Sequence, residues 1–176
     1  LPEIYLVQGA QRVLAGNGMT LLISDTGGDV GNVSRLVQTF LEHRVEGLIY
    51  VAEYHREVSL PAMLRGTPAV LTNCYDNAGT PAVVPDDVGG AAALVAGLVT
   101  RGHRRIGFLT LPERLVARGL RLEGYRKALA EARIEYDPDL VVTGALLDPV
   151  HEFDLLWDSL DRLLRLPDPP TAICCA

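Results

Sequence analysis

The sequence predicts an α/β fold in which mostly parallel sheets are flanked by helices. Short apolar, β-branched runs alternate along the 176-residue chain with segments whose apolar residues recur at helical spacing. The runs LIYV and IGFLT lack polar–apolar alternation, which is typical of strands that helices cover on both faces. Strands and helices that alternate in this way form right-handed crossovers in an open sheet.

Each predicted strand is a short apolar run bounded by turn residues. The predicted strands cover residues 20–25, 47–52, 69–73, 82–85, 104–110, 140–143 and 171–175. Each predicted helix carries an apolar stripe with polar flanks. These stripes cover residues 6–14, 33–41, 92–99 and 122–132, and a further stripe includes Trp157. Gly18 and Gly102 stand where helix C-terminal caps are expected, and Asp86 or Asp87 stands where an N-cap is expected.

Two features predict two lobes rather than one sheet. The polar stretch NCYDNAGTP at residues 73–81 separates two strands without room for a helix, so we expect the chain to cross a sheet edge there. Residues 85–90 then have the composition of a hinge into the next helix. We therefore expect an N-terminal lobe at residues 1–85 and a C-terminal lobe at residues 86–176. Because the chain opens in a helix and stops at a strand, we expect the fold to be incomplete at both ends.

Composition and charge narrow the classes of function. The chain has 16 basic and 22 acidic side chains, a net charge of −6 and 48% apolar residues. This acidic balance argues against a nucleic-acid-binding surface on this chain, because phosphate contacts need clustered Lys and Arg. We find no uncharged apolar run long enough to span a membrane, and no secretory signal. The three cysteines, Cys74, Cys174 and Cys175, are expected to be buried thiols in a reducing compartment, which makes the cytoplasm the expected location.

The motifs of enzymes and cofactor sites are missing from the sequence. The segment GNG at residues 16–18 precedes a predicted strand instead of following one, which is the reverse of a dinucleotide-binding loop. The four histidines show no metal-ligand spacing, and no serine lies in G-x-S-x-G. We therefore expect no cofactor, no metal and no enzymatic activity. The pair Asp86-Asp87 could serve acid–base chemistry, but an N-cap followed by a first-turn acid is the preferred interpretation. Trp157 is expected to pack in the core or against another subunit, with ligand stacking as the alternative.

Arg121 is the candidate binding residue. It lies just inside a predicted helix that follows the strand RRIGFLT and a turn at Leu111-Pro112. In open α/β sheets the ligand crevice lies outside the carboxyl ends of the strands, where this helix begins. A guanidinium there offers a planar set of donors for hydroxyl, carboxylate or phosphate groups. A surface salt bridge is the alternative role.

The sequence also resembles the effector-binding region of the lactose-repressor (LacI/GalR) family of bacterial transcription regulators. The similarity covers essentially the whole chain. Each motif alone is a weak signal, but the set of motifs, in the family's order and spacing, is specific. The motifs are D-D-x-G-G and G-H-R-R-I-G-F within VVPDDVGGAAALVAGLVTRGHRRIGFLTLP, R-x-x-G-Y-R-x-A-L within RGLRLEGYRKALAEARIEYDPDLVV, and P-P-T-A-I within PPTAICCA. The resemblance implies a periplasmic-binding-protein-like fold of two α/β lobes that close on a small effector, often a sugar or a nucleobase. It also implies a homodimer and operator DNA bound through a helix-turn-helix domain that is not in this chain.

The resemblance implies four ligand-binding positions. Arg121 matches the family arginine that binds polar groups of the effector, and Asn73 follows a strand where the family often has aspartate. Leu6 and Val51 fall where pocket-lining residues are common in the family. Asn73 in place of aspartate, and Ala117 where hydroxyls or another arginine are common, imply either a less polar pocket or a different ligand than in the typical sugar-responsive member of the family.

The sequence is compatible with three functions. The leading hypothesis is the ligand-sensing and dimerisation domain of a LacI-type regulator. The alternative is a solute-binding protein of a sugar transport system, which shares the fold but would need a secretory signal. The third, an α/β enzyme using Asp86, Asp87 or Arg121, lacks any activated nucleophile or base that the sequence can identify.

Overall fold

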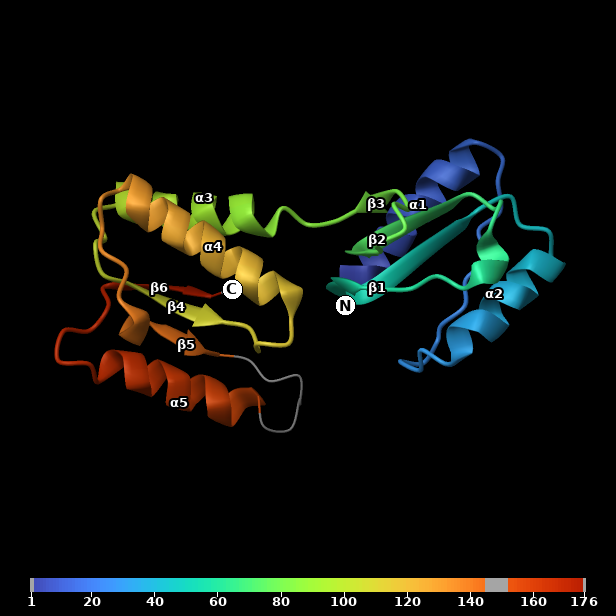
Figure 1. The fold of residues 1–176 in the computed structure, drawn as a ribbon. Helices are drawn as coiled ribbons and strands as arrows, with labels where there is room; N and C mark the ends of the chain where they lie inside the picture. The colour runs from blue at the N-terminus through green and yellow to red at the C-terminus, as the bar shows by residue number, and fades with distance from the viewer. Residues whose placement is uncertain (1, 145–151, 176) are drawn as a thin grey trace. The chain divides into compact units, whose positions relative to one another are not determined.

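The computed structural model describes residues 2–144 and 152–175 (Figure 1). The chain divides into two compact units, Leu1–Pro85 and Asp86–Ala176. Each unit is built on its own three-stranded sheet, and every pair of neighbouring strands is parallel. The predicted α/β class with parallel sheets flanked by helices is therefore confirmed. None of the helices in these two ranges is long and apolar enough to cross a membrane.

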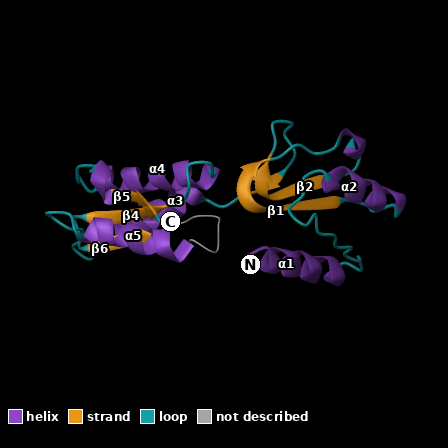
Figure 2. Cartoon of the chain, turned by 90° about the horizontal axis from the view of Figure 1, so that it is seen from below, coloured by secondary structure: helices purple, strands orange, loops and turns teal. Residues whose placement is uncertain are grey.

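The first unit combines two helices with a sheet of order β1-β2-β3. Its elements are α1 (Pro2–Gly16), α2 (Asn32–Glu42), β1 (Leu48–Glu57), the 3-10 turn η1 (Ala62–Leu64), β2 (Ala69–Tyr75) and β3 (Ala82–Val83). Figure 2 shows α1 along one side of the strands. Helix α2 buries Val33 and Val37 against Leu64, and β2 buries Leu71 and Cys74. These two clusters form the core of the first unit.

The ladder between β1 and β2 is interrupted beside Asn73. The register shifts between Val51 and Arg56 on β1. Asn73 has a φ of 58°, in the left-handed region that asparagine adopts more readily than most residues. Its side-chain amide donates hydrogen bonds to the carbonyl oxygens of Ala52 and Glu53 at 3.0 and 3.1 Å. The amide group of Asn73 therefore pairs backbone carbonyls that the interrupted ladder leaves without a strand partner.

The predicted strand at residues 20–25 does not form. Leu22 and Ile23 within it are 49% and 65% exposed. The composition of the segment suits a strand, but a ladder requires a neighbouring strand, and the described sheet of this unit pairs only β1, β2 and β3. The other six predicted strands form with shifted ends. Strand β1 extends beyond residue 52 to Glu57, and β3 ends at Val83.

The second unit places β4 at the centre of a sheet of order β5-β4-β6. Its elements are α3 (Asp87–Thr100), β4 (Ile106–Thr110), α4 (Val116–Glu131), the 3-10 turn η2 (Pro138–Leu140), β5 (Val141–Thr143), α5 (Glu152–Leu164) and β6 (Ala172–Cys175). Helices α3 and α4 cover one face of the sheet and α5 covers the other (Figure 1). All residues of β4 are consequently buried, as its continuous apolar sequence predicts.

The ends of the helices follow the predicted signals. Gly18 and Gly102 have φ values of 70° and 93° just after α1 and α3, a conformation that favours glycine. Asp86 caps α3, since its side chain accepts a hydrogen bond from the backbone N–H of Gly89 at 2.8 Å. Trp157 on α5 is 66% exposed, so its predicted place in the core is wrong. The helix turns Leu156 and Leu163 toward the sheet, and Trp157 lies off that stripe. A contact with another subunit stays a prediction.

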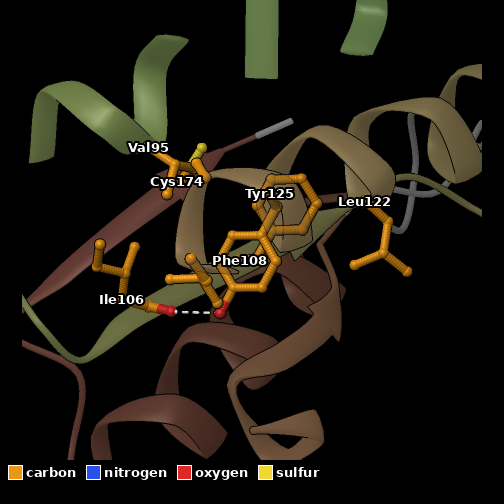
Figure 3. Close-up of a cluster of buried hydrophobic side chains, with 8 residues drawn as sticks. Val95, Ile106, Phe108, Leu122, Tyr125 and Cys174 are labelled. Carbon is orange, nitrogen blue, oxygen red and sulfur yellow. Dashed lines mark hydrogen bonds between the residues drawn. The ribbon is translucent and has the colours of Figure 1, made fainter. Parts of the chain in front are cut away.

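Among the described residues, Tyr125 of α4 belongs to the largest cluster of buried hydrophobic side chains (Figure 3). Its ring stacks on that of Phe108 with the two centroids 4.8 Å apart. Its hydroxyl donates a hydrogen bond to the carbonyl oxygen of Ile106 at 2.9 Å, so the buried polar group has a partner. Burial raises the pKa of Tyr125 to about 12. The phenol therefore stays neutral and keeps this bond across the physiological range.

Candidate functional site

Arg121 is held by an ion pair that joins the first turn of α3 to α4. The Arg121 Nε–H donates to Asp87 Oδ1 at an N–O distance of 2.6 Å. The Asp87 side chain is only 2% exposed, whereas that of Arg121 is 33% exposed. Charge-assisted hydrogen bonds of this kind are stronger than neutral ones, and removal of one partner of a buried ion pair is costly. The guanidinium is therefore fixed at one edge and open to solvent at the other.

The close packing of α3 and α4 makes this ion pair possible. Gly124, one turn after Arg121, has no side chain at the place where a Cβ would overlap the carbonyl oxygen of Val88. The same hypothetical Cβ would lie 2.9 Å from Ala91 Cβ. Gly124 and Ala91 thus let the two helix backbones come close together at Val88, the residue that follows Asp87. The motif R-x-x-G-Y supplies both the guanidinium and the glycine that brings its partner within reach.

The two neighbouring aspartates have separate roles. Asp86 is exposed and caps α3, while Asp87 is buried and pairs with Arg121. The predicted N-cap followed by a first-turn acid is therefore present. The ion pair adds a role that sequence spacing did not identify, because Asp87 and Arg121 are 34 residues apart. Arg121 forms the salt bridge that was considered as its alternative role, and it also lines a pocket.

A pocket of about 250 Å³ adjoins this ion pair. It lies beside the middle of β4 and the last residues of β6, because Phe108, Cys174 and Cys175 line it. The residues that line it are Asp86, Asp87, Gly90, Ala91, Leu94, Phe108, Arg121, Cys174 and Cys175. All of them belong to the second unit. The pocket therefore combines one guanidinium, two carboxylates and an apolar wall.

The cysteines differ from one another in exposure. Cys74 and Cys174 are buried free thiols, as predicted, but Cys175 is exposed. The expectation of a buried Cys175 is wrong because neighbouring residues of a strand point to opposite faces. Burial raises the pKa of Cys174 to about 11 and also raises the pKa of Cys74. Only Cys175 of the three is therefore available for reaction.

The other three predicted site residues lie in the first unit. Val51 on β1 pairs with Thr72, the neighbour of Asn73, so Val51 and Asn73 come from adjacent strands. The Asn73 amide N–H groups are used by backbone carbonyls. Leu6 lies on α1 and is 38% exposed. Arg121 is in the second unit.

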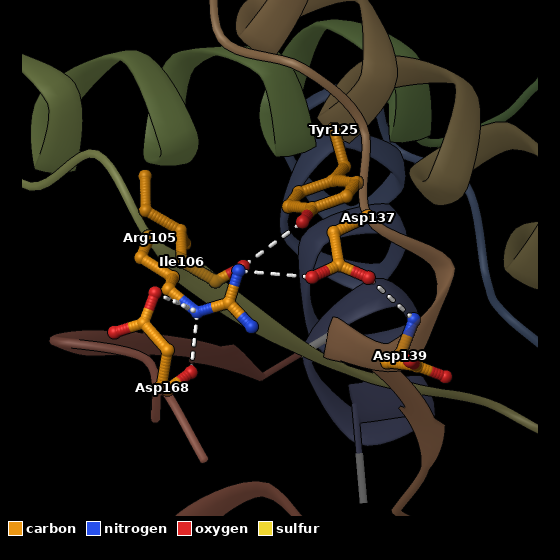
Figure 4. Close-up of polar contacts among 6 residues, drawn as sticks. All are labelled: Arg105, Ile106, Tyr125, Asp137, Asp139 and Asp168. Atoms are coloured by element: carbon orange, nitrogen blue, oxygen red, sulfur yellow. Dashed lines mark hydrogen bonds and ion pairs between the residues drawn. The ribbon is translucent and has the colours of Figure 1, made fainter. Parts of the chain in front are cut away.

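A second polar cluster surrounds Arg105 just before β4 (Figure 4). Its Nη1 donates to Asp137 Oδ2 at 2.9 Å, and its Nε lies 3.2 Å from Asp168 Oδ2 and also donates to the Asp168 carbonyl. Asp137 in turn accepts a hydrogen bond from the backbone N–H of Asp139 at 2.9 Å. A pocket of about 230 Å³ adjoins the cluster. Arg105 contacts Asp137 in the segment before β5 and Asp168 in the segment before β6. The cluster therefore holds both of these connecting segments against the start of β4.

No group of His, Cys, Asp or Glu in the described ranges could hold a metal ion. A parallel α/β unit with a pocket that combines a few charged groups with an apolar wall is typical of small-molecule-binding domains.

Comparisons with known proteins give the family. Residues 4–176 match the family described as periplasmic binding proteins and sugar binding domain of the LacI family, and the chain belongs to it. The ribose operon repressor of Escherichia coli (strain K12) is 30% identical over 172 residues, which are 96% of this chain and 50% of that protein. The transcriptional repressor CytR of the same strain is 26% identical, over 97% of this chain and 49% of the repressor. The chain thus spans about half the length of the curated relatives it matches.

Solved structures show the same fold. A protein from Rhizobium etli, described as a LacI-family transcriptional regulator, is 31% identical with a TM-score of 0.83, over 96% of this chain and 61% of that one. The regulator CelR, in complex with cellobiose, is 29% identical with a TM-score of 0.69, over 97% of this chain and 51% of its own. These relatives are regulators and repressors rather than enzymes.

Proposed function

We propose that this chain is the effector-binding part of a LacI-family transcription regulator, and that Arg121 binds the effector. The observation that carries the proposal is the pocket beside the Arg121–Asp87 ion pair. The Arg121 guanidinium is held by Asp87 at Nε and is 33% exposed, so its outer N–H groups can donate to a ligand. The pocket also has an apolar wall that includes Leu94 and Phe108.

The class of effector is a small sugar-like or nucleobase-like molecule. The family description names sugar binding, and the relative CelR is in complex with cellobiose. A pocket of about 250 Å³ is slightly smaller than the usual range of about 300–1,000 Å³ for ligand sites. In the first unit, Val51, Asn73 and Leu6 stay candidate contacts for a ligand.

The effector would act by its difference in affinity for two states of the protein. A ligand that binds one state more tightly shifts the population toward that state. We propose that the shift passes through a homodimer to operator DNA, which would be bound by a helix-turn-helix domain outside this chain. The repressor names of the relatives support this role and a cytoplasmic location.

A solute-binding protein of a sugar transport system is the second candidate, because the family description also covers periplasmic binding proteins. The two candidates differ in DNA binding. An electrophoretic mobility assay of the intact protein with the DNA upstream of its own gene separates them. The regulator binds that DNA and responds to effector, whereas the transport protein does not bind it.

Thermal stability tests the binding site. A panel of neutral sugars, including ribose and cellobiose, would be added to the intact protein during thermal unfolding. A ligand at 100 times its Kd should add about 2.7 kcal/mol of stability. Arg121→Ala should abolish that gain, while Arg162→Ala, an exposed change on α5, should keep it. Because Arg121→Ala leaves the buried Asp87 without this cation, the double variant Arg121→Met/Asp87→Asn provides a neutral comparison. An unchanged gain in both Arg121 variants would show that the site is elsewhere.

A further inference from the structure

We propose that the second unit holds a further ligand site, the pocket of about 230 Å³ beside Arg104 and Glu135, and that this site takes a small zwitterion with an apolar tail. The apolar α-amino acids are the class of molecule that fits this description. The site is separate from the Arg121 pocket, since the two share none of their described lining residues. Tyr125 lines the new site, whereas Phe108, on which its ring stacks, lines the Arg121 pocket.

The pocket lies at the amino end of β4, beside the end of α4. Its lining residues come from the start of β4, from α4 and from the segment that leads from α4 to β5. The apolar ones are Ile106, Leu129, Ile134 and Leu140. All but Ile134 are buried in the core, with exposed fractions of 1% for Ile106, 2% for Leu129 and 4% for Leu140. This part of the pocket is suited to a short apolar group.

The polar groups on the inner side of the pocket are already bonded within the protein (Figure 4). The Arg105 guanidinium lies between two carboxylates, with Nη1 2.9 Å from Asp137 Oδ2 and Nε 3.2 Å from Asp168 Oδ2. The Tyr125 hydroxyl donates to the carbonyl oxygen of Ile106 at 2.9 Å. These contacts hold the walls of the pocket in place, so recognition of a ligand falls to other side chains.

Among the described lining residues, Arg104 and Glu135 are the charged ones outside the Arg105 cluster. Both are exposed. Arg104 Nη1 donates to the carbonyl oxygen of Ala132 at 3.1 Å, which holds the guanidinium at the end of α4. A guanidinium has five N–H donors, so others can bind a carboxylate. The Glu135 carboxylate can accept hydrogen bonds from an ammonium group. One cation and one anion beside an apolar floor match the two charges of a zwitterion.

The charge and size of the pocket narrow the class of ligand further. Its charged lining residues are two arginines, Arg104 and Arg105, and two acids, Glu135 and Asp137, so their formal charges cancel. A ligand with a net charge therefore gains no overall attraction. The volume of about 230 Å³ is below the usual range of about 300–1,000 Å³ for ligand sites. An α-amino acid is small, has no net charge and carries its carboxylate and ammonium groups on one carbon.

Matched probes test the site on the intact protein by isothermal titration calorimetry. The candidate ligands are L-leucine, L-methionine and L-phenylalanine. Each is compared with its amide, which lacks the carboxylate, and with its desamino acid, which lacks the ammonium group. For L-leucine these analogues are L-leucinamide and 4-methylpentanoate. The test variants are Arg104→Met and Glu135→Gln. The controls are Arg162→Met and Glu123→Gln, which make the same changes at exposed positions that do not line the pocket.

At least one of the three amino acids should bind the wild type with a Kd of about 1 mM or tighter. Both of its analogues should bind at least about tenfold more weakly, because each loses a charge-assisted contact. Arg104→Met and Glu135→Gln should each weaken the amino acid by a similar factor, and the two controls should leave its Kd unchanged.

The inference would be overturned if none of the three amino acids binds, or if an analogue binds as tightly as its parent. Binding that neither test variant weakens would place the site elsewhere and overturn it as well. Arg104→Met also removes a bond to the end of α4. If circular dichroism shows that this variant does not fold, Glu135→Gln and the analogues still decide. The sugar screen does not enter this test, so the proposed effector site and the amino-acid site stand or fall separately.

Discussion

Replacing Gly124 with alanine should force α3 and α4 apart where their backbones meet. The added Cβ would overlap the carbonyl oxygen of Val88 and lie 2.9 Å from Ala91 Cβ. Ordinary contacts between carbon atoms are about 3.5–4.0 Å, so the contact with Ala91 alone requires a movement of roughly 0.6–1.1 Å, and the closer overlap with the Val88 oxygen requires at least as much. Overpacking of this size costs about 1–3 kcal/mol, and alanine returns up to about 1 kcal/mol of helix propensity. We expect a net loss of about 1–2 kcal/mol.

The movement should also weaken ligand binding, because Val88 follows Asp87 and Gly124 lies one turn after Arg121. The assay is thermal and urea unfolding of the intact protein, followed by titration with the sugar found in the screen. The matched control is Gly119→Ala, since Gly119 lies on the same helix with no atom within 4 Å of its hypothetical Cβ. This control should gain up to about 1 kcal/mol and bind normally.

Equal stability of the two alanine variants would refute the reasoning, because only one of them meets a neighbouring backbone. A Gly124→Ala protein that is destabilised but binds the sugar with wild-type affinity would refute only the link between helix spacing and the ion pair.

The core and the polar clusters of the second unit give the remaining predictions. Tyr125→Phe removes the hydroxyl that bonds to Ile106 and should lower stability by about 1–2 kcal/mol in urea unfolding. Because the folded pKa of Tyr125 is raised to about 12, the wild type should lose stability as pH rises from about 10 to 12, and the phenylalanine variant should lose less. Iodoacetamide should label Cys175 in the native protein and Cys174 only after unfolding, as mass spectrometry would show. Arg105→Met should lower stability by about 2 kcal/mol, since it leaves two aspartates without their shared cation.

A specific experimental outcome would contradict each of these predictions. A Tyr125→Phe protein as stable as the wild type at neutral pH would show that a water molecule replaces the tyrosine hydroxyl as hydrogen-bond donor to the Ile106 carbonyl oxygen. Labelling of both adjacent cysteines at equal rates would show that the end of β6 opens in solution. A fully stable Arg105→Met protein would show that η2 and the segment before β6 are held by apolar packing alone.

The sequence predicts the fold well where local pattern and packing agree. Strand β4 has a continuous apolar sequence and is buried on both faces, and Asp86 caps α3 as its position predicts. The segment 20–25 has an equally good strand composition but forms no ladder, since pairing depends on a neighbour that composition does not reveal. Trp157 shows the same limit for a helix, because its exposure depends on which face meets the sheet.

The site is less predictable than the fold. Arg121 could be proposed from its place after a strand, but its partner Asp87 is 34 residues away, and only the packing of two helices brings them together. The sequence does contain an indication of that close approach. Small residues, glycine and alanine, lie near the start of α3, and the motif R-x-x-G-Y places a glycine on α4. Asn73 was proposed as a ligand contact, and its left-handed backbone and two carbonyl contacts could not be inferred from residue type alone.

The strand order of the second unit has a consequence for biosynthesis. Strand β4 is central, yet its partner β6 pairs Ala172 with Ile106, 66 positions later in the chain. A nascent chain that has exposed α3, β4 and α4 outside the ribosome still carries an unpaired sheet edge with a buried-type sequence. Such late, long-range pairing slows folding and exposes an aggregation-prone edge. This unit should therefore complete its fold only after β6 has left the exit tunnel, and chaperones should bind it until then.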